Sequence, residues 1–308
     1  MGIAHLDEVQ GHKLEIGHLH ATWTFLGAAA GAIGVGVTRL QIPAGGWSTP
    51  AHDHGVEEEI FYVLGGRGLS WHKGETFEIA EGDCILYLPR KGPHTLHAVE
   101  DLDVLAFGPR VYDESARFPR LGAPLVGIRY VETHEGSLDG LPVQFVRESE
   151  LGPPDLPEPG PRPPTIVNLR DVEPTEMVRP RIERTRRNFG KAVGSVTTGL
   201  QHVQVAPGMA SAPFHCHSME EELFVVLDGG GTLRLGDEEI AVRPGHVVAR
   251  PPDTGVAHTF RGGDGGLTYL AYGTREPGDA CFYPDSNKVH IAGVTFRVEP
   301  LDYWDGED

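Results

Sequence analysis

The sequence has few cysteines and no long apolar run. Its 308 residues include three cysteines, Cys84, Cys216 and Cys281, which are too few and too scattered for a disulfide framework. The longest apolar stretch, residues 27–37, has about 11 residues and is rich in glycine, whereas a membrane span needs about 20. The N-terminal segment has no basic region followed by an apolar core, as a secretory signal would. We therefore expect a soluble, cytoplasmic protein.

Positive charge is also scarce. Lysine and arginine number 26 against 44 aspartates and glutamates, which gives a formal net charge of −18 with histidine neutral. A field of that sign repels phosphate backbones and anionic membranes. We expect neither nucleic acid nor a membrane as a partner, and favour a small-molecule substrate.

Glycine and proline, by contrast, are abundant. The 41 glycines and 25 prolines make up more than a fifth of the chain, which favours many short strands joined by turns over a helical bundle. No window of about fifteen residues shows convincing helical periodicity with capping signals. Residues 59–64 (EIFYVL) and 222–227 (ELFVVL) are apolar runs bounded by glycines, as expected for strands that end in turns. The sequence therefore predicts an all-β protein.

The chain contains an internal repeat. With an offset of 163 residues, His52, His54, Glu59, Gly66 and Gly82 align with His215, His217, Glu222, Gly229 and Gly245. Between the copies, residues 152–164 contain seven prolines in thirteen positions, which favours an extended, semi-stiff connection. We predict two domains, residues 1–150 and 166–308, joined by a proline-rich linker at 151–165.

Each copy has a set of candidate metal ligands. His52 and His54 are two residues apart, so on a strand they point to the same face. Glu59 begins the next predicted strand, and His94 follows a proline-glycine turn. One inserted residue in the second copy gives the equivalent set, which is His215, His217, Glu222 and His258.

Three neutral imidazoles and one carboxylate suit a first-row divalent ion such as Mn, Fe, Co, Ni, Cu or Zn. Four protein ligands on an octahedral ion leave two positions for substrate, water or dioxygen. Two complete sets predict about two metal ions per chain, because each copy carries its own ligands.

The choice of glutamate has alternatives. Glu57 and Glu58, like Glu220 and Glu221, precede the chosen residues, and a three-residue spacing would select Glu58 and Glu221. We prefer Glu59 and Glu222, because six residues then separate each from the glycine that ends the strand.

These residues resemble the cupin superfamily. Its first motif, G-x5-H-x-H-x(3,4)-E-x6-G, is matched by Gly46, His52, His54, Glu59 and Gly66. The second motif is matched more loosely, with Ala98 in place of its asparagine, and the second copy fits both motifs with small shifts. The resemblance implies a bicupin: two tandem jelly-roll β-barrels, each with one metal held by three histidines and a glutamate. The ligand set is most similar to that of quercetinase-like bicupins.

Three functional hypotheses follow from the resemblance and the ligands. The first is a metal-dependent oxidoreductase of dioxygenase type that acts on an enolisable or phenolic small molecule, with Glu59 or Glu222 as ligand or transient base. The second is an isomerase, decarboxylase or lyase that uses the metal as a Lewis acid. Oxalate-degrading bicupins carry an arginine where Thr49 and Ala212 stand here, which argues against oxalate. The third is a non-catalytic metal or small-molecule binding protein. Exposed sheet edges favour a homo-oligomer.

Overall fold

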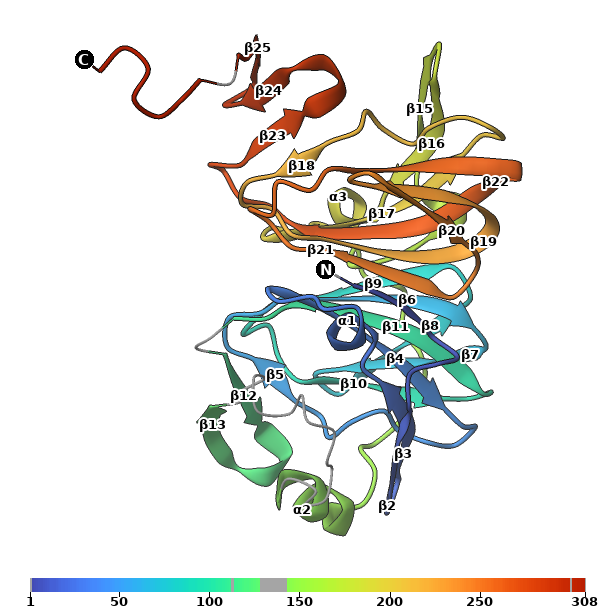
Figure 1. Ribbon diagram of the computed structural model, residues 1–308. Helices are drawn as coiled ribbons and strands as arrows, with labels where there is room; N and C mark the ends of the chain where they lie inside the picture. Colours follow the sequence, from blue (N-terminus) through green and yellow to red (C-terminus); the bar gives the residue numbers. More distant parts are fainter. Residues whose placement is uncertain (1, 112–113, 128–142, 300, 308) are drawn as a thin grey trace.

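The computed structural model describes residues 2–111, 114–127, 143–299 and 301–307. It confirms the predicted fold class: the chain is mostly β and forms two similar double-sheet halves that stack on each other (Figure 1). None of the described helices is long and apolar enough to cross a membrane.

The strands and helices alternate with short turns along the chain. Up to the linker, the strands are β1 (Ile3–His5), β2 (His12–Ile16), β3 (Leu19–Thr24), β4 (Val35–Ile42), β5 (Asp53–His54), β6 (Glu59–Gly65), β7 (Arg67–His72), β8 (Glu75–Ala80), β9 (Asp83–Tyr87), β10 (His94–Ala98), β11 (Leu102–Pro109), β12 (Ser115–Phe118) and β13 (Ala123–Gly127). After it they are β14 (Ile166–Asn168), β15 (Pro174–Arg179), β16 (Ile182–Asn188), β17 (Thr198–Val205), β18 (Cys216–His217), β19 (Glu222–Leu235), β20 (Glu238–Val242), β21 (His246–Arg250), β22 (His258–Thr274), β23 (Ala280–Tyr283), β24 (Lys288–Ile291) and β25 (Val294–Arg297). The helices are α1 (Leu26–Ala29), α2 (Val143–Leu151) and α3 (Phe189–Val193).

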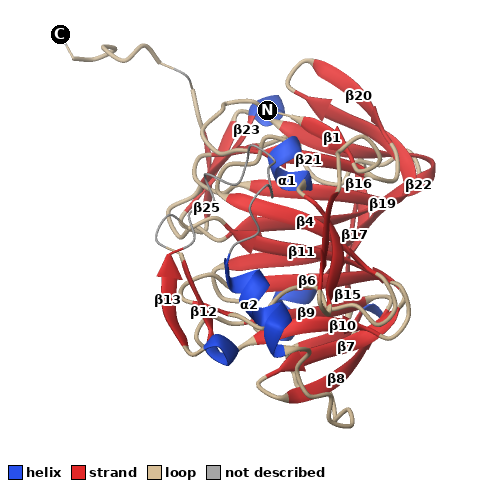
Figure 2. Cartoon of the chain, turned by 90° about the horizontal axis from the view of Figure 1, so that it is seen from below, coloured by secondary structure: helices blue, strands red, loops and turns tan. Residues whose placement is uncertain are grey.

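The two halves have equivalent sheets. In the first, the order β14-β9-β6-β11-β4-β3-β2 forms the large sheet, and β10-β7-β8 forms a smaller one. In the second, the large sheet has the order β1-β21-β19-β22-β17-β16-β15, with β20 paired to β19. The long strands β19 and β22 pair along nearly their whole length. Helix α2 lies outside the sheets, near β12 and β13 (Figure 2).

Strand β6 is buried on both faces, which explains its nearly continuous apolar sequence. Phe61 and Val63 face the interior of the first half, whereas Ile60 and Tyr62 belong to a core shared by both halves. The strand ends at Gly65, and the φ of the following Gly66 is +83°; a Cβ at Gly66 would lie 1.9 Å from the carbonyl oxygen of Asp101. A side chain at Gly66 would therefore force the neighbouring backbone apart.

Large side chains fill the interface between the halves. The rings of Phe107 and Tyr272 lie 5.2 Å apart, and those of Tyr62 and Phe189 lie 5.5 Å apart. All four are buried in one continuous apolar cluster. Because burial of apolar surface is the main favourable term in association, this cluster binds the halves into one unit.

Each large sheet contains one strand from the opposite side of the linker. Near the N-terminus, β1 pairs antiparallel with β21, with Ile3 opposite Val248. After the linker, β14 pairs with β9, with Ile166 opposite Ile85. The strand pairing therefore crosses the expected domain boundaries twice, in opposite directions.

The two large sheets end at free edges. Strand β15 is the last strand of the second large sheet, and all six of its residues are exposed. Strand β2 ends the first. The homo-oligomer expected from such edges stays a prediction.

Candidate metal centres

The first predicted ligand set comes together in the first half. His54 lies on β5, Glu59 begins β6 and His94 begins β10, while His52 immediately precedes β5. The Glu59 Oε2 atom lies 2.8 Å from His94 Nε2 and 3.1 Å from His54 Nε2. His52 Nε2 is 3.1 Å from His54 Nε2. One potential ligand atom from each of the four residues falls within 4.8 Å of the others.

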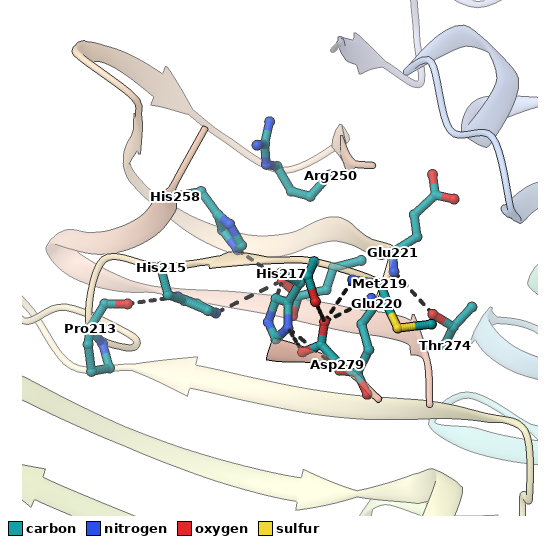
Figure 3. Close-up of polar contacts among 12 residues, drawn as sticks. Pro213, His215, His217, Met219, Glu220, Glu221, Arg250, His258, Thr274 and Asp279 are labelled. Atoms are coloured by element: carbon teal, nitrogen blue, oxygen red, sulfur yellow. Dashed lines mark hydrogen bonds and ion pairs between the residues drawn. The ribbon is translucent and has the colours of Figure 1, made fainter. Parts of the chain in front are cut away.

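The second set gathers in the same way but more loosely. Glu222 Oε2 lies 3.2 Å from His258 Nε2, 3.7 Å from His217 Nε2 and 4.0 Å from His215 Nε2. Figure 3 shows the three imidazoles converging, with His258 at the start of β22, His217 on β18 and His215 immediately before β18. His215, His217 and Glu222 are also partly exposed, whereas His258 is buried. The second cluster is thus wider and more accessible to solvent.

The backbone orients one histidine of each set. His52 Nδ1 lies 2.9 Å from the carbonyl oxygen of Pro50, and His215 Nδ1 lies 2.7 Å from that of Pro213. A carbonyl oxygen can only accept, so Nδ1 carries the proton and Nε2 keeps its lone pair for a metal. Burial lowers the pKa of His52 to about 3 and that of His215 to about 4, which keeps both imidazoles neutral.

Carboxylates behind the ligands orient a second histidine of each set. His217 Nδ1 is 2.6 Å from Asp279 Oδ2, and Asp279 also accepts from the backbone N–H groups of Met219 and Glu220 (Figure 3). The equivalent Glu114 lies 3.5 Å from His54 Nδ1. Such outer carboxylates commonly fix the ring and raise the basicity of metal-binding histidines. The sequence interpretation missed both residues, although an offset of 165 aligns one acid with the other.

The second cluster leaves a buried oxygen without a partner. Glu222 Oε2 has no hydrogen-bond partner among the described residues. Burial alone would raise the pKa of Glu222, but the imidazoles of His258, His215 and His217 lower it overall, so the carboxylate is ionised. A negatively charged oxygen facing three nitrogens is the environment that a divalent cation stabilises. The donor set therefore fits a first-row metal ion.

The neighbouring glutamates point elsewhere. Glu58 and Glu221 reach across the interface and accept hydrogen bonds from backbone groups of the opposite half. Glu57 accepts from the backbone N–H of Val111, and Glu220 accepts from that of Glu276. Glu220 Oε2 lies 3.8 Å from His217 Nδ1, and Glu57 lies near His54, whereas Glu59 and Glu222 are the glutamates that lie against Nε2 atoms of the histidines.

Pockets lie beside both ligand sets, although Glu59 lines the first pocket and the three histidines of its set do not. The pocket beside Glu59 has a volume of about 450 Å³, and much of its wall is apolar, with Phe25, Ala28, Ala106 and Phe107 among the lining residues. One pocket of the second half has about 240 Å³, and another, lined by His217, Glu220 and Asp279 among others, has about 370 Å³. The smaller one is called the second pocket below. Its lining residues include members of the second ligand set and several polar side chains: Arg184, Arg186, Gln201, His215, Glu222, His258, Tyr269 and Tyr283. The sequence interpretation did not identify these arginines.

The fold and the duplicated His–Glu clusters define a tandem jelly-roll protein with two candidate metal centres. Comparison with known families agrees, because the cupin domain matches the chain twice, at residues 38–107 and 201–270. The chain is a bicupin, as its motifs indicated.

Similar proteins extend this comparison. An uncharacterized protein of Methanocaldococcus jannaschii is 43% identical over 58 residues, which is 19% of this chain and 45% of that protein's length. Among solved structures, protein Ylba of E. coli has a TM-score of 0.58 at 16% identity, over 89% of this chain and 90% of its own. Oxalate decarboxylase of Bacillus subtilis, a protein with Mn(II) centres, has a TM-score of 0.57 at 17% identity, over 88% of this chain and 76% of its own. These structural likenesses show a shared bicupin fold.

Proposed function

We propose that the protein is a metal-dependent enzyme that binds about two divalent first-row ions per chain. His52, His54, Glu59 and His94 are the ligands of the first ion. The equivalent ligands of the second ion are His215, His217, Glu222 and His258. The observation that carries the proposal is the buried Oε2 atom of Glu222, which makes no well-aligned hydrogen bond among the described residues and faces three imidazole nitrogens 3.2–4.0 Å away beside a pocket.

The second centre is the proposed site of reaction, and its chemistry is isomerisation, decarboxylation or elimination of a small molecule. A bound divalent ion would act there as a Lewis acid that polarises an oxygen of the substrate. Around it, the pocket offers guanidinium, phenol and amide groups that orient a polar substrate. Glu222 is close enough to the same space to serve as ligand or transient base.

A dioxygenase reaction at the first centre is the second candidate. The specific observation in its favour is the larger, more apolar pocket beside Glu59, which suits an aromatic or enolisable molecule. Its wall includes Phe25 and Phe107. Under this candidate, the two halves would differ in substrate although they share a ligand set.

Turnover with and without oxygen distinguishes the two candidates. The protein, loaded separately with Mn, Fe, Ni, Cu and Zn, is incubated with panels of small carboxylates and phenols while oxygen consumption and products are measured. We expect anaerobic turnover that is lost in H215A/H217A and retained in H52A/H54A. Oxygen uptake that is lost only in H52A/H54A would support the dioxygenase instead. Metal binding with no turnover in either panel would contradict both and favour a non-catalytic binding protein.

A further inference from the structure

Two arginines face the second pocket, and no ion pair among the described residues joins either of them to a carboxylate. Arg184 and Arg186 are two residues apart on β16, so their side chains leave the same face of the strand. Both line the 240 Å³ pocket. Ion pairs within the described ranges join other arginines to carboxylates, but neither of these two. The pocket therefore holds two guanidinium groups against one carboxylate, that of Glu222, in a chain with a net charge of −18.

Arg184 is held in place from behind. Its Nη1 donates to the carbonyl oxygen of Ser211 at 2.6 Å, and the side chain is partly buried. Burial and the nearby charge of Arg186 lower the pKa of Arg184. Keeping two like charges together in a partly desolvated pocket is unfavourable, and a bound anion would remove that cost.

Neutral donors complete the lining. Gln201 on β17 and Tyr269 on β22 reach the same pocket. Burial raises the pKa of Tyr269 to about 12, so its phenol stays protonated and can donate a hydrogen bond. Two guanidinium groups flanked by neutral hydrogen-bond donors are a common arrangement for binding a carboxylate or phosphate.

The first half has lost, or never had, this arrangement. Thr22 pairs with Gln41 as Thr185 pairs with Gln204, which fixes the alignment of the two strands. At that register Arg184 corresponds to Ala21 and Arg186 to Trp23. The first half buries Ala21 in its apolar interior, and Trp23 packs partly buried against it. The cationic lining is therefore specific to the second pocket and is not a requirement of the fold.

We propose that the second pocket binds a small organic anion whose carboxylate or phosphate group is held by Arg184 and Arg186. Its reacting end then faces His215, Glu222 and His258, so this inference rests on the proposed function and names its substrate class. The volume of about 240 Å³ is below the range of about 300–1,000 Å³ typical of drug-sized ligands. The occupant is accordingly a small metabolite and not a polymer.

Calorimetric titration of the full chain tests the proposal. The probes are malonate and succinate for the carboxylate source, and inorganic phosphate and glycerol phosphate for the phosphate source. Titrations are made with both metal-loaded and chelator-treated protein. We expect R184A and R186A each to weaken binding of the preferred anion at least about tenfold, with R184K and R186K intermediate. Because Arg184 also supports the backbone at Ser211, R186A provides the variant with less risk to folding.

R187A is the matched control. Arg187 lies on the same strand, donates to Gln204 at 3.2 Å and does not line the pocket, so its loss changes the net charge equally. Unchanged binding in R187A would support the proposal. Equal weakening in R187A and R186A, or no binding of any probe by the wild type at tens of millimolar, would overturn it. If the protein takes up no metal during reconstitution but still binds the anion through Arg184 and Arg186, the proposed metal-dependent function fails and this inference stands.

Discussion

Glu58 and Glu221, which occupy equivalent positions in the two copies, each reach into the other half of the molecule. Glu58 accepts hydrogen bonds from the backbone or hydroxyl groups of residues 195–198, including Thr198 N at 2.7 Å. Glu221 accepts from the N–H groups of Ile33 and Gly34. Two equivalent carboxylates therefore form hydrogen bonds across the interface, and each directly precedes a candidate metal ligand in the sequence.

The two carboxylates are expected to respond differently to substitution. Burial would raise the pKa of Glu58, but the many hydrogen-bond donors around its carboxylate lower that pKa overall. Glu221 has fewer donors, so burial dominates and its pKa is raised. E58Q should destabilise the protein at pH 7 by about 2 kcal/mol, since hydrogen bonds to a charged acceptor are lost. E221Q should be close to neutral or stabilising. Chemical denaturation at pH 7 measures both.

Acidification should narrow the difference in stability between these two variants. A lowered pKa stabilises the fold above the unfolded value of Glu58, near 4.5, and that contribution is lost as the pH falls through the lower folded value. The raised pKa of Glu221 has the opposite sign: its ionisation costs stability as the pH rises above about 4.5. The gap between wild type and E58Q should therefore narrow near pH 4. A constant gap from pH 7 to pH 4 would contradict the assignment.

Removing histidines should empty the two centres independently. H52A/H54A is expected to lower the metal content from about two ions per chain to about one, and H215A/H217A should do the same. The first pair contributes to one cluster and the second pair to the other, with no ligand in common. Elemental analysis after reconstitution measures the stoichiometry. Fewer than about half an ion per chain in the wild type would contradict the two-centre proposal.

Asp279 is expected to position a ligand without binding the metal itself. D279N removes the charged acceptor 2.6 Å from His217 Nδ1 and should weaken the second centre by about 10–100-fold. Competition with a chelator gives the affinity, measured in the H52A/H54A background so that only one ion is counted. E114Q provides the comparison for the first centre. An unchanged affinity in D279N would show that the aspartate serves only the backbone around Met219.

Deleting residues 1–6 should destabilise the opposite half. The deletion removes β1 and exposes β21, so the amides of residues 246–250 should lose protection in hydrogen exchange, with a cost of about 2–4 kcal/mol for the lost pairing. Removing the exposed tail from Leu301 onward is the control and should leave β21 protected. Faster exchange confined to the first half would contradict the observed pairing.

Local patterns made the fold class predictable from the sequence. Strand periodicity fixes which side chains share a face, so a His-x-His pair followed by a glutamate carries most of the information about one cluster. The repeat then doubles the evidence. The expected strand end at Gly65 and Gly66 is confirmed, but β19 continues through Gly229 to Leu235 with a register shift there, so the prediction of a strand end at Gly229 was wrong. Such patterns report only on residues that are close together in the chain.

Contacts between distant strands were harder to foresee. Nothing near Glu58 in the sequence indicates that its partners are residues 195–198, because the stacking of the halves creates that contact. The same holds for Arg184 and Arg186, whose strand had to be placed beside the pocket before their role became visible. A position-by-position comparison of the copies would have marked them, since the first copy has Ala21 and Trp23 there.

The exchange of β1 and β14 has a consequence for the history of the molecule. Cutting the chain at the linker would strip each half of a strand and leave a bare sheet edge, so neither could readily be inherited or transplanted alone. The duplication is in that sense irreversible. The two copies diverged within one chain, and the first half now has an apolar interior where the second half has Arg184 and Arg186.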